Sequence, residues 1–322
     1  MIHAISIVRR TQHAVLTTTL CLCALGAVAQ AGDLPEPKPV PRLQTIPLPY
    51  DQASFQRDGV EITRYHFGPS LERPFLYPII GPSGRSLTRM GHPHDPQGHS
   101  HHNSVWITHH DINGNDFWGD TSGAHIRHKR IVKYTDEGET SSITAENEWT
   151  TKEGEVLLTE TRTTTVTLLP NKEWLLTIDL ELNAKDKPVT FGKTPFGMIG
   201  VRMAKTIGVH DGGGRIRNSE GAVNEKEVFW KPARWVDYSG PIAPGTTEGV
   251  TLFDHPANPN HPSHFHVRND GWMGASLTFE APRVIEPNTA LKLRYGLYIH
   301  ADLKPTATIE TQYQSFTRLS FP

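Results

Sequence analysis

The chain has 322 residues, and its 32 lysines and arginines against 34 aspartates and glutamates give a net charge of −2 with histidine neutral. No stretch forms a basic stripe, which argues against a protein that binds nucleic acid or an anionic membrane. Both cysteines, Cys21 and Cys23, lie within residues 1–31. The rest of the chain therefore contains no residue for a disulfide, a thiolate metal ligand or a cysteine nucleophile.

Residues 1–31 are predicted to form a Sec-type signal peptide that is cleaved after Ala31. Two arginines precede an apolar run over residues 14–28, and Ala29 and Ala31 form a small-x-small cleavage site. This run is shorter than the roughly 20 apolar residues that span a bilayer, and no later run approaches that length. We therefore expect a periplasmic or secreted protein without a membrane span.

Residues 32–49 alternate proline with polar residues and are predicted to be an extended linker, which leaves residues 50–322 as a single domain. Two alternating, β-branched runs, 160–169 and 174–182, flank four turn residues and predict a long antiparallel hairpin. No window of twelve or more residues has the period of a helix. We expect an all-β fold, a large antiparallel β-sandwich like the galactose mutarotase supersandwich, with a jelly roll as the alternative.

The histidines are the most informative residues of the chain. Nine of the eighteen fall between His92 and His128. Four more lie far down the chain: His255, His261, His264 and His266. Imidazole is both a common metal ligand and a side chain that exchanges a proton near neutral pH. Clusters so far apart in sequence can meet only by folding, so they indicate one site assembled from two parts of one domain.

Two His-x-His pairs stand out within these clusters. On an extended backbone, His99 and His101 point to one face of a strand and His102 to the other. His264 and His266 repeat the spacing, and two such pairs on neighbouring strands could supply four nitrogens to one divalent metal ion. Neither pair has a carboxylate at a diagnostic offset, and the alternative is that these histidines donate hydrogen bonds to backbone carbonyls in loops. A divalent metal is therefore one hypothesis for a cofactor, with His99, His101, His264 and His266 as candidate ligands.

Residues 113–118 read Asn-Gly-Asn-Asp-Phe-Trp. Because Asn-Gly favours a tight turn, the acid and the aromatic residues that follow are predicted at a loop tip. Amide and carboxylate groups beside an aromatic ring suit a sugar, whose hydroxyls bond to the polar groups while its apolar face lies on the ring. We expect Asn113, Asp116 and Trp118 to contact a substrate; the alternative is a capped turn with the aromatic residues in the core.

Other candidates lie near the histidines in sequence. Arg89 precedes the first run, and Arg268 follows His266 by two residues, on the same face of a strand. Each guanidinium could hold an anionic or hydroxyl group of a substrate, or could form a surface salt bridge instead. The aromatic segment 229–238 could form a cleft wall or pack in the core. His300, close to an acid at a strand end, is a candidate for proton transfer.

Seven segments have the pattern of a known bacterial family: Pro74 to Pro78, Leu87 to Arg89, His99 to His102, Asn113 to Trp118, Arg202 to Ala204, Ala233 to Gly240 and His255 to Pro262. On these segments the chain resembles the family labelled "methane oxygenase PmoA". The membrane subunit of particulate methane monooxygenase is a bundle of transmembrane helices, whereas this chain has no run able to span a bilayer, so we regard the label as misassigned. Exported families of this kind resemble parts of polysaccharide-degradation systems, which implies a sugar substrate.

The leading hypothesis is an exported carbohydrate-active enzyme, a hydrolase, lyase or epimerase, that uses histidine acid–base chemistry with or without a metal. The sequence lacks the G-x-S-x-G and H-E-x-x-H motifs. The candidate catalytic residues are His101, His102, His264 and Arg268. The candidate substrate contacts are Arg89, Asn113, Asp116 and Trp118. The alternatives are a non-catalytic sugar-binding module and an oxidase or oxygenase with histidine-bound copper or iron.

Overall fold

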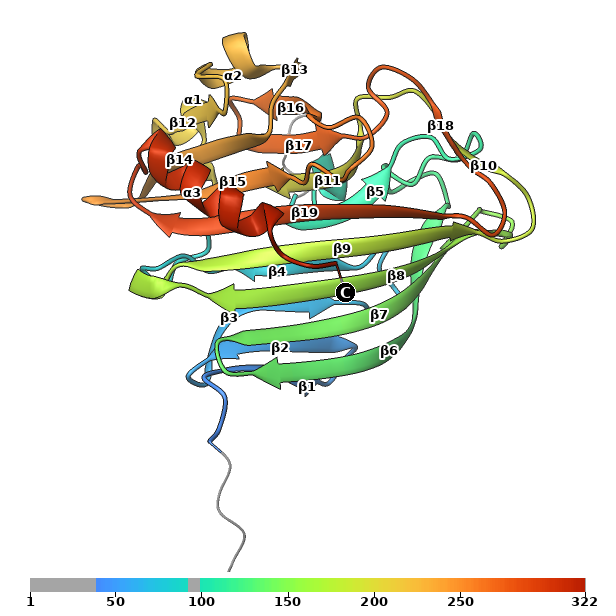
Figure 1. The fold of residues 1–322 in the computed structure, drawn as a ribbon, viewed down its shortest axis with the longest axis horizontal. Helices are drawn as coiled ribbons and strands as arrows, with labels where there is room; N and C mark the ends of the chain where they lie inside the picture. The colour runs from blue at the N-terminus through green and yellow to red at the C-terminus, as the bar shows by residue number, and fades with distance from the viewer. Residues whose placement is uncertain (1–38, 92–98, 322) are drawn as a thin grey trace, which may run out of the picture. The chain divides into compact units, whose positions relative to one another are not determined.

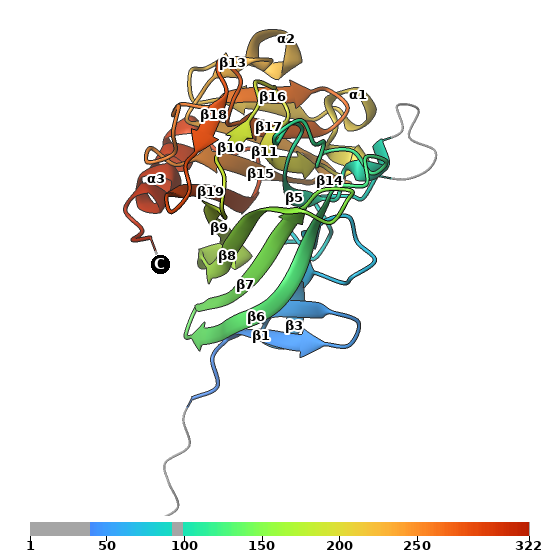
Figure 2. The same ribbon diagram turned by 90° about the vertical axis from the view of Figure 1, so that its right-hand side faces the viewer.

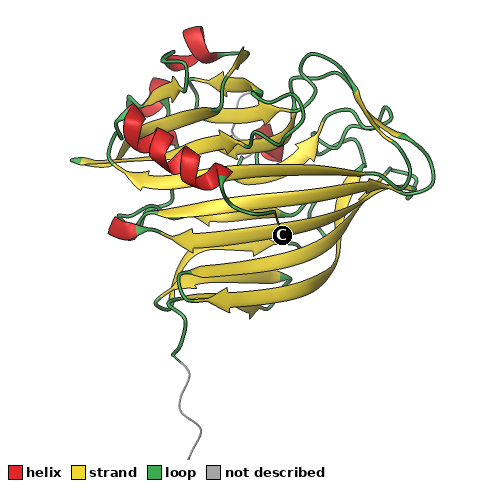
Figure 3. Cartoon of the chain, in the orientation of Figure 1, coloured by secondary structure: helices red, strands yellow, loops and turns green. Residues whose placement is uncertain are grey.

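The computed structural model describes residues 39–91 and 99–321. The predicted signal peptide, the start of the predicted linker and His92 and His94 lie outside the described residues. From Val40 onward the chain forms one compact unit. Strands make up most of its regular structure (Figure 3).

The first large sheet has nine strands in the order β1-β2-β3-β4-β5-β11-β17-β16-β13, with antiparallel neighbours throughout. Its strands are β1 Leu43–Leu48, β2 Gln52–Arg57, β3 Val60–His66, β4 Phe75–Ile79, β5 Val105–His109, β11 Gly197–Arg202, β17 Trp272–Ser276, β16 His264–Arg268 and β13 Lys231–Pro232. The sheet thus joins N-terminal strands to strands from the last third of the chain (Figure 1).

The second large sheet has eight antiparallel strands in the order β12-β14-β15-β19-β9-β8-β7-β6. They are β12 Arg215–Asn218, β14 Trp235–Ala243, β15 Thr246–Asp254, β19 Ala290–Ala301, β9 Trp174–Ala184, β8 Val156–Leu168, β7 Thr140–Thr150 and β6 His125–Glu137. The predicted hairpin is confirmed: β8 and β9 pair from Leu168 opposite Trp174 to Leu158 opposite Ala184.

The remaining elements are short. Strands β10 Val189–Phe191 and β18 Arg283–Ile285 form a separate pair. The helices are α1 Val209–Gly212, α2 Asn224–Val228 and α3 Thr306–Thr317, with 3₁₀ turns at His99–His101, Pro170–Lys172 and Lys205–Ile207. Helix α3 buries Ile309, Tyr313 and Phe316 in an aromatic cluster on the outer side of the second sheet.

The core lies between the two large sheets. Residues of β7 alternate between buried and half-buried positions along the whole strand, so one face of that strand is packed against the core. Ile107 of β5 and Leu176 of β9 belong to the same buried cluster although their strands are in different sheets. Figure 1 draws the long strands β6–β9 across the N-terminal strands, and Figure 2 gives the side view. The fold is the predicted all-β antiparallel sandwich. A jelly roll has eight strands in its two sheets together, whereas the two large sheets here have nine and eight strands.

One boundary of the predicted linker is wrong. Residues 43–48 fall inside the segment 32–49 but form β1, which pairs with β2 along its whole length. Leu43 is fully buried in the core. Proline suggested a linker because it cannot donate a hydrogen bond to a neighbouring strand, but β1 is an edge strand, and Pro47 is tolerated there.

Candidate active site

The two histidine clusters meet at one cleft, which has a volume of about 790 Å³. Seven of the predicted site residues line it: His99, His101, His102, Asp116, Trp118, His266 and Arg268. Folding thus brings together residues more than a hundred and fifty positions apart, as the separation of His102 from His266 in the sequence shows.

A row of residues across four adjacent strands, the packed floor, lies behind the lining of the cleft: it begins at Trp106, which stacks on the lining residues His102 and Trp272, and ends at His266. Trp106 on β5 pairs with Gly200 on β11. Gly200 pairs on its other side with Gly274 on β17, and Gly274 pairs with His266 on β16. A Cβ atom at Gly200 would lie 2.5 Å from the Trp106 ring, and one at Gly274 would lie 2.8 Å from the Trp272 ring. The two glycines therefore leave the room in which these indoles lie against the sheet.

His102 is packed between aromatic rings at the centre of the cleft. Its imidazole stacks on Trp106 at 5.2 Å, on Trp272 at 5.1 Å and on His99 at 4.5 Å, measured between ring centroids. Burial, followed by the charges of His101 and Arg202, holds the pKa of His102 well below its ordinary value. Its Nδ1 atom is buried without a hydrogen-bond partner among the described residues. His102 lines the cleft, so Nε2 is the nitrogen that can reach a ligand.

The backbone around these residues differs from the extended strand that was predicted. His99–His101 forms a 3₁₀ turn, not a strand, so the expected alternation of side chains does not apply. The turn gathers the three imidazoles on one side: His101 lies 4.5 Å from His102 in an edge-on arrangement and 6.0 Å from Trp118. Burial lowers the pKa of His101 to about 4.

His266 enters the same cleft from β16. Its ring meets the face of Trp272 edge-on at 5.6 Å and lies between Phe196 at 5.1 Å and Phe229 at 5.0 Å. Only 8% of the residue is exposed, and burial lowers its pKa to about 4. Its Nδ1 atom is also buried without a partner in the described part of the chain. His102 and His266 are thus neutral imidazoles at pH 7, and each has one nitrogen with no partner in residues 39–91 and 99–321.

The loop after β5 supplies the opposite wall. Asp116 Oδ1 accepts hydrogen bonds from the backbone N–H groups of Trp118 (2.7 Å) and Gly119 (3.1 Å), and it lies 3.2 Å from His110 Nδ1. Trp118 is buried against Trp106 and still borders the cleft. The carboxylate therefore caps a turn, as in the alternative interpretation, and this turn forms a wall of the cleft.

Two buried arginines, Arg73 and Arg202, bind residues of the loops and strands around the cleft. The sequence did not indicate Arg73 as a site residue. Only 1% of Arg73 is exposed, and it donates hydrogen bonds to Asn103 Oδ1 (2.8 Å), to Asp120 Oδ1 (3.1 Å) and to the carbonyl of Trp118 (3.0 Å). It thereby ties the turn that carries the histidines to the loop of Trp118. Arg202 is equally buried and pairs at 3.0 Å with Asp270, a lining residue. No sequence motif marks Arg73, because its hydrogen-bond partners lie in loops far from it along the chain, and local pattern does not show that they meet it.

Comparison with known proteins gives a family. Residues 52–314 match a family of unknown function, DUF6807. The chain belongs to this family. No curated protein matches the chain, and the family match does not support the methane-oxygenase label.

The DUF6807 chain is similar, at low TM-scores, to three solved structures. They are the heparan sulfate lyase HepC of Pedobacter heparinus (TM-score 0.38, 9% identity, 79% of this chain and 34% of that one), a GalM/aldose epimerase homologue of C. elegans (0.34, 8%, 81% and 99%) and the 4-alpha-glucanotransferase of Thermococcus litoralis (0.29, 10%, 81% and 39%). The chain spans about a third of the lyase. TM-scores this low carry no argument about the chemistry of the DUF6807 protein, which must come from its own cleft.

His264 does not reach the cleft, contrary to prediction. It shares a strand face with His266, but it lines a separate pocket of about 330 Å³. There its ring stacks on Phe279 at 4.4 Å, and its Nε2 atom lies 3.6 Å from Glu280 Oε1. The two His-x-His pairs therefore do not converge on one point. In residues 39–91 and 99–321, no group of three or more histidine, cysteine, aspartate or glutamate side chains is arranged to hold a metal ion.

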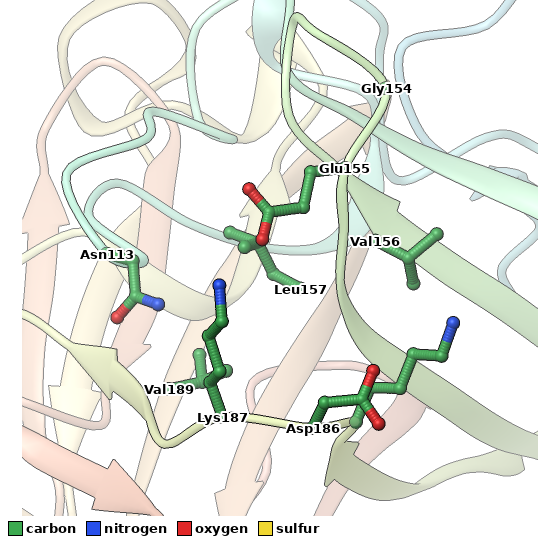
Figure 4. Close-up of a pocket in the computed structure, with 9 residues that line it drawn as sticks. Asn113, Gly154, Glu155, Val156, Leu157, Asp186, Lys187 and Val189 are labelled. Carbon is green, nitrogen blue, oxygen red and sulfur yellow. The ribbon is translucent and has the colours of Figure 1, made fainter.

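Asn113 is also not among the residues that line the cleft, contrary to prediction. Its side-chain oxygen accepts a hydrogen bond from the backbone N–H of Thr190 (2.8 Å), so it fastens one loop to another. It borders a different pocket of about 340 Å³, where Glu155 and Lys187 extend from neighbouring loops (Figure 4). Its positive φ of 49° explains the Asn-Gly sequence, which serves the turn.

Arg89 is not among the residues that line the cleft, although its charge contributes to lowering the pKa of His102. It therefore lies near the described lining of the cleft rather than in it, and its contact with a substrate stays a prediction.

The remaining histidine candidates are structural. His300 is fully buried, and its Nε2 atom lies 2.9 Å from Asp237 Oδ1 in the second sheet, away from the cleft. The His261 ring lies with Nδ1 2.8 Å from Asp254 Oδ2, inside the turn that leads to β16.

In the part of the chain that the structure describes, no helix has the length and apolar character needed to cross a membrane.

Proposed function

We propose that the cleft is the active site of a carbohydrate-active enzyme that works by histidine acid–base chemistry. One observation carries the proposal: imidazoles from two remote segments share a cleft with two indoles, and two of these imidazoles are neutral and buried, with no partner for Nδ1 among the described residues. Trp118 and Trp272 border the cleft, where the exposed part of each indole suits the apolar carbons of a sugar, and the polar groups beside them suit its hydroxyls.

The geometry divides the histidines into two roles. His101 is the more open ring, and its lowered pKa keeps it unprotonated at neutral pH, so it is the proton acceptor. His102 and His266 each have one buried nitrogen without an acceptor, which favours the tautomer with the proton on Nε2. They then donate hydrogen bonds to a substrate oxygen, which are strongest when that oxygen gains negative charge in the transition state.

The carboxylates of the cleft are already engaged. Asp116 accepts two backbone N–H groups, Glu225 pairs with Arg268 at 3.1 Å, and Asp270 pairs with Arg202. A typical glycoside hydrolase instead needs two carboxyl groups that flank the scissile bond, one of them as a proton donor. We therefore favour a lyase or an epimerase, in which a neutral base removes a proton from a sugar carbon or hydroxyl, over a hydrolase.

The test is a panel of uronic-acid and neutral-hexose oligosaccharides, assayed for new double bonds, new reducing ends and exchange of anomers by NMR. We expect turnover that His101→Gln reduces at least a hundredfold, while His128→Gln, on β6 of the other sheet, leaves it unchanged. The rate should fall as the pH drops through about 4, because the base must be neutral. Sugar binding that survives His101→Gln, with no turnover by the native protein, would show a binding module instead. Stoichiometric copper or iron in the purified protein would favour the oxidase.

A further inference from the structure

A strained and exposed tryptophan lies at the edge of the cleft. Trp230 is 44% exposed and has a φ of +58°, in the left-handed region that bulky residues rarely adopt. Many of the other positive-φ residues of the described chain are asparagines or aspartates, whose side chains favour that region. The backbone N–H of Trp230 donates to the carbonyl of Phe265 (2.8 Å), and its ring stacks on Phe229 at 4.5 Å. The fold thus holds a large apolar ring, partly exposed to solvent, in a backbone conformation that tryptophan disfavours, which indicates a function.

Rings continue from this tryptophan in both directions. Trp230 lies 6.3 Å from His266 in the cleft and 5.7 Å from Phe279 on the other side. Phe279 in turn stacks on His264 at 4.4 Å, with the two rings nearly parallel. An aromatic row, Trp230, Phe279 and His264, therefore leads from the active-site cleft to the pocket of about 330 Å³.

The second pocket has the groups that a sugar needs. Besides the ring of Phe279, it presents the imidazole of His264 and the carboxylate of Glu280, which is mostly exposed. The half-buried ring of Phe279, one face of which is covered by His264, lies beside a hydrogen-bond donor and a charged acceptor, as the indoles of the main cleft lie beside polar groups. A ligand confined to the main cleft would not touch Phe279, whereas a chain of sugars lying along the row would.

We propose that the aromatic row is a second sugar-binding subsite, so that the substrate is an oligosaccharide or polysaccharide rather than a single sugar. This inference rests on the proposed function of the cleft and adds the length and direction of the substrate. The chain of sugars would enter the cleft beside His266, cross Trp230 and end at His264.

The experiment compares a single sugar, its disaccharide and its hexasaccharide, using both a uronic acid and a neutral hexose. For the hexasaccharide, Trp230→Ala should reduce kcat/KM about tenfold, which is about 1.4 kcal/mol of lost binding. Phe279→Ala should do the same, Trp230→Phe should restore most of the loss, and values for the short substrates should not change. Val132→Ala, which removes an exposed apolar side chain from β6, is the matched control.

Direct binding separates the two proposals. Titration calorimetry is repeated with His101→Gln as the background. If the hexasaccharide binds but is not turned over, and Trp230→Ala weakens binding, the proposed reaction is wrong and the subsite stands. If turnover occurs and Trp230→Ala affects all lengths equally or none, the subsite is wrong and the reaction stands. Failure of every sugar to bind overturns both.

Discussion

Replacing His266 by phenylalanine should separate the stability of the protein from its function. His266 is almost fully buried among Phe196, Phe229 and Trp272, so a phenylalanine ring can occupy the same space. The substitution also removes the unsatisfied Nδ1 atom. At pH 7 we expect a free energy of unfolding equal to or above that of the native protein, together with a loss of catalysis.

The pH dependence of the free energy of unfolding shows how large the effect of His266 is. The unfolded chain binds a proton at His266 below pH 6.5, whereas the folded protein does so only below about pH 4. The contribution of neutral His266 to the free energy of unfolding is therefore fully present above pH 6.5, and it is lost as the pH falls from 6.5 toward 4. Between pH 7 and pH 5 the native protein should lose about 2 kcal/mol more than His266→Phe does.

Urea unfolding at several pH values, followed by tryptophan fluorescence, measures this difference. His210→Gln, at an exposed histidine that also lines the cleft, should leave the pH dependence as it is in the native protein. Equal slopes for the native protein and His266→Phe would refute the reasoning, because they would mean that His266 is protonated in the folded state as readily as in the unfolded one.

Three further substitutions test the architecture around the cleft. Gly200→Ala should lower the free energy of unfolding by about 1–3 kcal/mol in denaturant titrations, since the new methyl group meets the Trp106 ring; an unchanged midpoint would contradict the packed floor. Arg73→Met should cost about 3 kcal/mol and also reduce turnover, because the loops that it joins come apart; full activity in a folded variant would show that they are held otherwise. Asn113→Ala should cost about 1–2 kcal/mol with kcat/KM unchanged, and a drop in kcat/KM alone would restore it as a substrate contact.

Much of the fold could be predicted from the sequence because its signals are local. The alternation of residues in 160–169 and 174–182 predicts strands, and the four residues between them predict the turn, without reference to any other part of the chain. The proline-rich segment was misjudged for a related reason. Whether Pro47 lies in a linker or on an edge strand depends on whether β2 is there to pair with it, and local pattern does not contain that information.

The sequence alone determined that histidines were concentrated in two segments, that the chain after residue 31 had no cysteine, and that strands would dominate. Only the tertiary structure decided which histidines share a cleft. His264 and His266 occupy the same face of one strand, yet the rings of Trp230 and Phe279 lie between their pockets. The packed floor behind the cleft arises from the register of four strands that come from three separate parts of the chain, and such pairing is set by packing across the whole sandwich.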